Sequence, residues 1–65
     1  MTTTTKRVLV PIANGSEEIE SVTIIDTLRR AHIEVIVAKV GGEDDNESNP
    51  LQIKASRGVY IVADT

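Results

Sequence analysis

Residues 7–40 read RVLVPIANGSEEIESVTIIDTLRRAHIEVIVAKV, and this stretch decides the fold class. Residues 7–12 are a short, nearly continuous apolar run rich in branched side chains, which is typical of a strand buried in a parallel sheet. Residues 33–40 form a second run of the same kind. The segment between them has helical spacing, so the stretch predicts a strand–helix–strand unit, which is right-handed in nearly all known cases.

The expected helix lies within residues 14–31. Asn14 or Ser16 can cap its start, and Asn14 with Glu17 three residues later resembles a capping box. Acidic residues fall in the first turn and two arginines in the last, an arrangement that suits the helix dipole at both ends. The spacing predicts one apolar face, made of Ile24, Ile25, Leu28 and Ala31.

The second part of the chain predicts a loop followed by two short strands. Residues 41–50 read GGEDDNESNP, which is acidic and free of apolar side chains, so a solvent loop is expected. Residues 51–54 and 59–63 have the composition of strands, and residues 55–58 between them predict a hairpin or sharp bend. The fold class is therefore α/β, with a βαβ unit followed by a β-hairpin.

The length bounds what such a chain can do alone. It has 65 residues, no Cys, a single His and one aromatic side chain. A chain of this size buries only about 60% of its unfolded surface, and small folds usually add disulfides, a metal or a partner. The composition excludes a disulfide and gives no reason to expect a metal site or a cofactor. We therefore expect residues 1–65 to be the N-terminal part of a single domain, cleaved or separate from the remainder and inactive as an enzyme alone.

The charge and hydropathy of the chain indicate which partners it is not expected to bind. The net charge is −3 and no segment is strongly basic, so nucleic-acid binding is not expected. There is no signal-like start, and no apolar run approaches the roughly 20 residues needed to span a bilayer. We expect no membrane association and a cytoplasmic location.

The turn between the first strand and the helix is the most informative place for function. Ligands of open α/β sheets bind outside the carboxyl ends of the strands, where residues 13–18 lie. This turn has one Gly rather than three, and no Gly-Lys-Ser/Thr follows, so it is neither a dinucleotide fingerprint nor a P-loop. The three carboxylates at the end of this turn and just after it, Glu17, Glu18 and Glu20, would repel a phosphate.

A helical wheel separates these three carboxylates. Glu17 projects onto the side of Leu28 and Ile24, Glu20 onto the edge of that side, and Glu18 onto its other flank. All three can be surface acids that complement the helix dipole. Alternatively, a carboxyl on the buried edge has its pKa raised by desolvation and can donate a hydrogen bond to an active-site group. The wheel does not choose between Glu20 and Glu17.

The chain resembles the amino-terminal end of the ThiJ/PfpI superfamily, in the branch of the parkinsonism-associated deglycase and chaperone. A basic residue precedes the first apolar strand, G-S-E-E-I-E follows at residues 15–20, and D-T-L-R-R-A occupies residues 26–31. Residues 55–59, ASRGV, and the closing Ala63-Asp64 fit the same pattern. The resemblance covers residues 6–64.

The resemblance implies a flavodoxin-like α/β sandwich that usually forms a homodimer. It also implies an active site that pairs a reactive Cys with a carboxyl from the first helix, which falls on Glu20. Gly15 and its neighbouring backbone would line the pocket. This chain has no Cys, so it supplies at most half of such a site, and the Cys would come from the remaining C-terminal part. The family's charged cluster near the dimer interface falls on Glu17, Asp26, Arg30 and Arg57.

Three functions then remain open. The first is a Cys-dependent, stress-protective enzyme of glyoxalase or deglycase type that acts on a small reactive carbonyl. The second is a redox sensor or holdase chaperone, in which the Cys is oxidised rather than turned over. Ala55 stands where some family members carry a second Cys, so redox chemistry is excluded there. The third is a receiver-like signalling domain, which needs an acidic pair after the first strand, where residues 11–13 are Pro-Ile-Ala.

Overall fold

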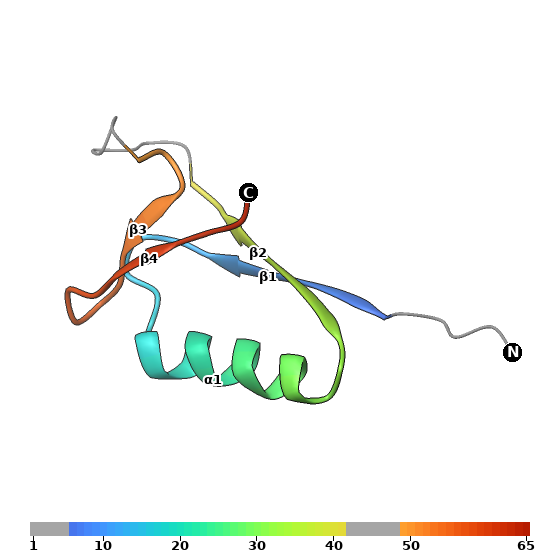
Figure 1. The fold of residues 1–65 in the computed structure, drawn as a ribbon. Helices are drawn as coiled ribbons and strands as arrows, with labels where there is room; N and C mark the ends of the chain where they lie inside the picture. The colour runs from blue at the N-terminus through green and yellow to red at the C-terminus, as the bar shows by residue number, and fades with distance from the viewer. Residues whose placement is uncertain (1–5, 42–48) are drawn as a thin grey trace, which may run out of the picture.

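The computed structural model describes residues 6–41 and 49–65, so most of the expected loop at 41–50 lies outside the described residues. The described elements are β1 (Arg7–Ile12), α1 (Glu18–Arg30), β2 (Glu34–Lys39), β3 (Gln52–Lys54) and β4 (Tyr60–Val62). The helix lies along one side of the β1–β2 pair, and the β3–β4 hairpin lies beside the start of the helix (Figure 1). The α/β prediction, a βαβ unit followed by a hairpin, is confirmed.

The β1 and β2 strands pair in parallel along their whole length. Their register runs from Arg7 opposite Glu34 to Ile12 opposite Lys39. Alternate residues of both strands point to the same face and form the core, which places branched aliphatic side chains between the sheet and α1. The buried side chains of this face are Val10, Ile12, Val35 and Val37.

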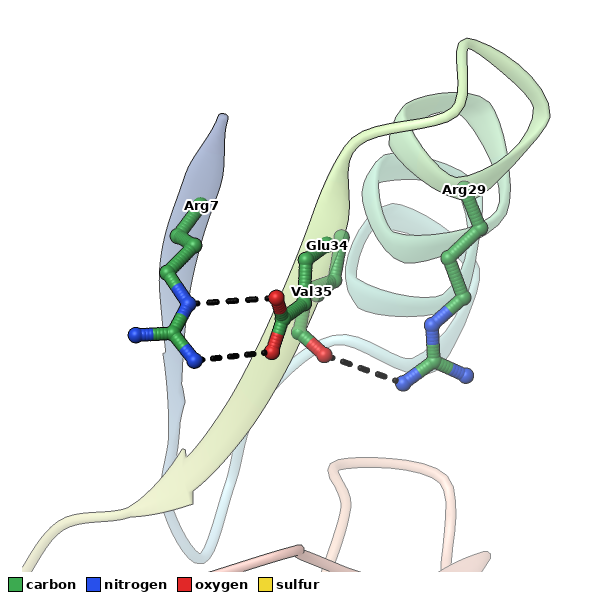
Figure 2. A network of polar contacts seen from close by, with 4 residues as sticks. All are labelled: Arg7, Arg29, Glu34 and Val35. Carbon is green, nitrogen blue, oxygen red and sulfur yellow. Dashed lines mark hydrogen bonds and ion pairs between the residues drawn. The ribbon is translucent and has the colours of Figure 1, made fainter. Parts of the chain in front are cut away.

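Polar contacts lie at the amino-terminal end of the β1–β2 pair. Arg7 donates from Nε and Nη2 to the two carboxylate oxygens of Glu34, at 3.1 and 3.4 Å. Arg29 reaches from α1 to the carbonyl oxygen of Val35, at 3.4 Å, so the helix is tied to β2 from the other side (Figure 2). Arg7 and Glu34 are exposed, and exposed pairs stabilise little, so the apolar alternation sets the register.

The hairpin completes the core. The β3 and β4 strands are antiparallel, with Ile53 opposite Ile61. Ile53 is only 1% exposed and joins Ala55 and Ala63 in the same cluster as the buried residues of β1 and β2. The hairpin therefore covers the carboxyl end of the βαβ unit rather than extending its sheet.

The chain after β4 turns onto β2. The backbone N–H of Asp64 donates to the carbonyl of Val37 at 2.8 Å, and the N–H of Lys39 donates to the carbonyl of Thr65 at 2.8 Å. The Asp64 carboxylate also accepts from the N–H of Val37 at 2.8 Å. These bonds occupy part of the outer edge of β2, a place where unpaired backbone groups would otherwise face solvent.

The start of α1 differs from the sequence prediction. The N-cap is Glu17, whose carboxylate accepts from the N–H groups of Ile19 and Glu20, both at 3.1 Å. The prediction that Asn14 or Ser16 caps the helix is wrong. A glutamate side chain long enough to fold back over the first turn satisfies two of the orphan N–H groups at once.

The two residues expected as caps have other partners. The side chain of Asn14 accepts from the N–H of Lys54 at 2.9 Å, across 40 residues of sequence. The hydroxyl of Ser16 accepts from the N–H of Ala13 at 2.9 Å and closes the turn that follows β1. Both polar side chains therefore stabilise the loop before the helix.

The buried face of α1 is also rotated from the expected one. Its least exposed residues are Glu18, Ser21, Ile25 and Leu28. Ile24 is 50% exposed, and Ala31 is an exposed C-cap residue, so the predicted apolar face is only half right. The face is narrow because only one side of the helix meets the two-stranded sheet.

The C-terminus of α1 is a Schellman motif with an unusual residue. The N–H of Ile33 donates to the carbonyl of Leu28 at 3.1 Å, and the N–H of His32 donates to the carbonyl of Arg29 at 3.0 Å. His32 has a φ of +64° and is the only described residue besides glycines with positive φ. This left-handed position favours Gly, because a side chain there crowds the following carbonyl.

Replacing His32 by Gly is expected to stabilise the protein by about 0.5–1 kcal/mol, since relief of the left-handed strain exceeds the entropy cost of an added glycine. The measurement is the free energy of unfolding in guanidinium chloride. Ala31→Gly is the matched control, because Ala31 has a φ of −85° and gains nothing from the change. A destabilised H32G variant would contradict the expectation.

Candidate functional site

The three glutamates at the start of α1 have three different environments. Glu18 is 8% exposed and is the buried charged residue of the described chain. Its Oε1 accepts from the hydroxyl of Ser56 at 3.1 Å, and its Oε2 accepts from the N–H groups of Arg57 at 2.7 Å and Val59 at 3.3 Å. The hypothesis that Glu18 is a surface acid, on the other flank of the apolar face, is therefore wrong.

Glu18 acts within a longer contact between two loops. The N–H of Gly15 donates to the carbonyl of Lys54 at 2.9 Å, and the N–H of Ser56 donates to the carbonyl of Ser16 at 2.8 Å. With the Asn14–Lys54 bond, these contacts align the loop before α1 with the turn between β3 and β4. We call this set of contacts the loop clasp.

The clasp also governs the protonation of Glu18. Burial by itself raises the pKa of Glu18, but hydrogen bonds from its own N–H, from Arg57 and Val59, and from Ser56 outweigh burial and leave it below the ordinary value. A carboxyl with a lowered pKa contributes stability at pH values above its unfolded pKa. That contribution is lost as the pH falls through the folded-state pKa.

Glu20 is the free carboxylate of the three. It is exposed, and its side chain accepts no hydrogen bond from any residue in the described ranges. It lines a shallow hollow on α1 together with Ile19, Thr23 and Ile24. Ile19 is 75% exposed and Ile24 is 50% exposed, so the carboxylate is flanked by uncovered apolar side chains.

Gly15 has a structural role at this site. Its φ is +91°, a conformation that side chains rarely adopt, and its N–H is part of the loop clasp. The two hollows beside α1 are lined by other residues. The expectation that Gly15 lines a pocket therefore stays a prediction for the complete site.

The four residues of the expected charged cluster form two separate groups. Arg30 Nε and Asp26 Oδ2 lie 3.0 Å apart in an exposed pair one helical turn long. Arg57 and Glu17 line a second hollow, together with Glu18, Ile19 and Val59. About two and a half turns of α1 separate Glu17 from Asp26. Within one chain, therefore, the four side chains do not form a single cluster.

Glu18 and Ser56 are the residues that sequence reasoning missed. One signal was present, because Glu18 lies three, seven and ten residues before Ser21, Ile25 and Leu28, a helical stripe. Nothing local marked Ser56. Residues 6–41 and 49–65 contain no group of three side chains able to hold a metal ion, and α1 is too short and polar to cross a membrane.

Comparison with known proteins gives the ancestry of this arrangement. The DJ-1/PfpI family pattern matches residues 6–65. The chain belongs to the DJ-1/PfpI family. The expected ThiJ/PfpI membership is therefore confirmed, and the helix acids and the ASRGV turn are parts of one family segment.

Individual DJ-1 relatives agree with this assignment. Protein DJ-1 homolog B of Arabidopsis thaliana is 52% identical over 60 residues, which cover 92% of this chain and 12% of that protein. Parkinson disease protein 7 homolog of Danio rerio is 43% identical over 60 residues, which cover 28% of its length. The solved structure of Toxoplasma gondii DJ-1, oxidized, superposes with a TM-score of 0.75 at 52% identity, covering 91% of this chain and 28% of that one. The chain thus spans between about an eighth and somewhat over a quarter of these DJ-1 relatives.

Proposed function

We propose that this chain supplies the first-helix carboxyl of a Cys-dependent, stress-protective enzyme that acts on small reactive carbonyls by glyoxalase- or deglycase-type chemistry. Glu20 is that carboxyl, and the nucleophilic Cys comes from a part of the protein outside these 65 residues. The active protein is a cytoplasmic homodimer that needs no cofactor.

The observation that carries the proposal is the difference among the three glutamates. Glu17 is committed to capping α1, and Glu18 is committed to the loop clasp. The Glu20 carboxylate has no partner in the described chain and lies among exposed apolar side chains. A carboxyl in such surroundings becomes desolvated when another part of the protein covers it, which is the condition for holding a proton near neutral pH.

The chemistry needs both a thiolate and a proton carrier. The thiolate adds to the aldehyde carbon of the substrate, and the carbonyl oxygen then takes a proton. A protonated Glu20 beside the sulfur can stabilise the thiolate by a hydrogen bond and then move protons between the substrate oxygen and carbon. This proton transfer leaves a thioester between the Cys and a lactoyl group. One water then hydrolyses the thioester, so the carbon–sulfur bond breaks and lactate and the free thiol are released. No electron acceptor is required.

A second candidate is redox sensing, supported by the oxidized state in which the Toxoplasma gondii relative was solved. In that function a peroxide oxidises the thiolate to a sulfenic acid, and hydroxide leaves. Glu20 would then stabilise the thiolate without carrying a proton through a catalytic cycle.

Methylglyoxal consumption by the complete protein, with a reductant present, tests the proposal. Many molecules of methylglyoxal consumed per protein chain are expected. Consumption that stops at one equivalent, or does not occur, would contradict an enzymatic role. In that case, rapid peroxide oxidation of the thiol would favour the sensor.

A further inference from the structure

The loop clasp contains a residue whose role goes beyond holding the fold. Glu18 is buried, yet two of its three partners are backbone N–H groups on either side of Gly58, in the turn that carries Arg57. We propose that Glu18 is a positioning residue, which fixes this turn so that the guanidinium of Arg57 faces the hollow beside Glu17. This inference rests on the proposed homodimer, in which Arg57 and Glu17 lie at the subunit contact.

The geometry explains why one side chain can set this position. Oε2 of Glu18 accepts from Arg57 and Val59 together, so these two N–H groups must point inward toward the same oxygen. The intervening Gly58 has a φ of +89°, which lets the chain turn back between them. With both N–H groups held inward, the turn has little freedom to redirect Arg57.

The guanidinium itself is uncommitted. The Arg57 guanidinium makes no hydrogen bond or ion pair within the described ranges, although Arg57 lines a hollow with Glu17, Ile19 and Val59. The Glu17 carboxylate is engaged with the helix N-terminus. A cation held in place beside exposed Ile19 and Val59 fits a contact with an acidic group of the second subunit.

Two conservative variants separate shape from charge. Glu18→Gln keeps the length of the side chain; its carbonyl can accept from Arg57 and Val59, and its amide can donate to the Ser56 hydroxyl. Glu18→Asp keeps the negative charge but draws the carboxylate back by one carbon–carbon bond, about 1.5 Å. A positioning role requires the Gln variant to work better than the Asp variant.

The experiment uses the complete protein. Amide hydrogen exchange at Arg57 and Val59 is expected to quicken about tenfold or more in Glu18→Asp and much less in Glu18→Gln. The dimer dissociation constant from sedimentation is expected to rise about tenfold in Glu18→Asp, as in Arg57→Ala, and to change less than about threefold in Glu18→Gln. The double variant Glu18→Asp/Arg57→Ala should have the same dimer dissociation constant as Arg57→Ala alone. The reason is that the displaced turn weakens the dimer only by moving the Arg57 side chain.

Several results would overturn the inference. If Glu18→Gln is the weaker dimer, Glu18 acts by charge. If the two single variants add in the double variant, Glu18 acts independently of Arg57. Unchanged exchange in Glu18→Asp would mean that the clasp does not hold the turn. None of these readouts depends on carbonyl turnover, so failure here leaves the assignment of Glu20 to its own test.

Discussion

Glu20→Ala in the complete protein is expected to lower turnover of methylglyoxal by about 100-fold or more and to raise the pKa of the reactive thiol. The proposed site places a carboxyl against a thiolate, and two negative charges in contact are costly, so one group holds a proton. The thiol must be ionised to react, so the proton belongs to Glu20. Removing Glu20 removes both the hydrogen bond to sulfur and the proton carrier.

Glu20→Gln divides these two effects. The amide still donates a hydrogen bond to the sulfur, so much of the thiolate should persist at neutral pH, but it cannot carry the catalytic proton. We expect thiol alkylation against pH to stay near the wild-type curve while turnover falls nearly as far as in Glu20→Ala. Glu34→Gln is the control, because Glu34 is an exposed acid paired with Arg7 at the far end of β2.

Wild-type thiol reactivity and turnover in Glu20→Ala would show that Glu20 is a surface acid. If Glu20→Ala lost thiol reactivity but kept wild-type turnover, Glu20 would stabilise the thiolate without carrying the catalytic proton. Glu18 is not a suitable control here, because its carboxylate is buried in the loop clasp.

Ile53→Ala is expected to destabilise the protein by about 2–5 kcal/mol, the cost of emptying a fully buried aliphatic position. Ile53 is 1% exposed and packs in the cluster that joins the hairpin to Ile12 and the other buried residues of the sheet. Total stability of a typical domain is about 5–15 kcal/mol, so this single change can remove a large share of it.

The measurement is the guanidinium midpoint of the complete protein. Ile53→Val should cost only about 0.5–1.5 kcal/mol, because one methylene is lost. Lys54→Ala, at the exposed neighbouring position, should change stability by less than about 0.5 kcal/mol. An Ile53→Ala loss no larger than that of Lys54→Ala would mean that the hairpin contributes little to the core.

Local pattern was a good guide to the elements. The branched apolar runs at residues 7–12 and 33–40 became β1 and β2, and the helical spacing between them became α1. The composition of residues 51–63 predicted the hairpin, with strands a residue or two shorter than expected. These features depend on neighbours within a few residues, so they can be read along the chain.

Local pattern was a poor guide to the roles of polar side chains. Asn14 has the chemistry of an N-cap, but its side-chain oxygen accepts instead from the backbone N–H of Lys54, 40 residues away. Ile24 looks like part of the apolar face, yet the two-stranded sheet reaches only the stripe that includes Ile25 and Leu28. A helical wheel gives the angle between side chains around the helix, but it does not say which side of the helix packs against the sheet.

The amino-acid sequence by itself determined the α/β class, the order of the elements and the family, because strand and helix periods and the motifs GSEEIE and ASRG are contiguous. Only the tertiary structure decided what each acid of that motif does. Glu18 meets Ser56, Arg57 and Val59 across 38, 39 and 41 residues, while Glu20, two positions along the same helix, meets none of them. Two residues of helix turn a side chain by about 200°, so identical carboxyls close in sequence face opposite surroundings, and only the packing of the hairpin against α1 determines which of them is buried.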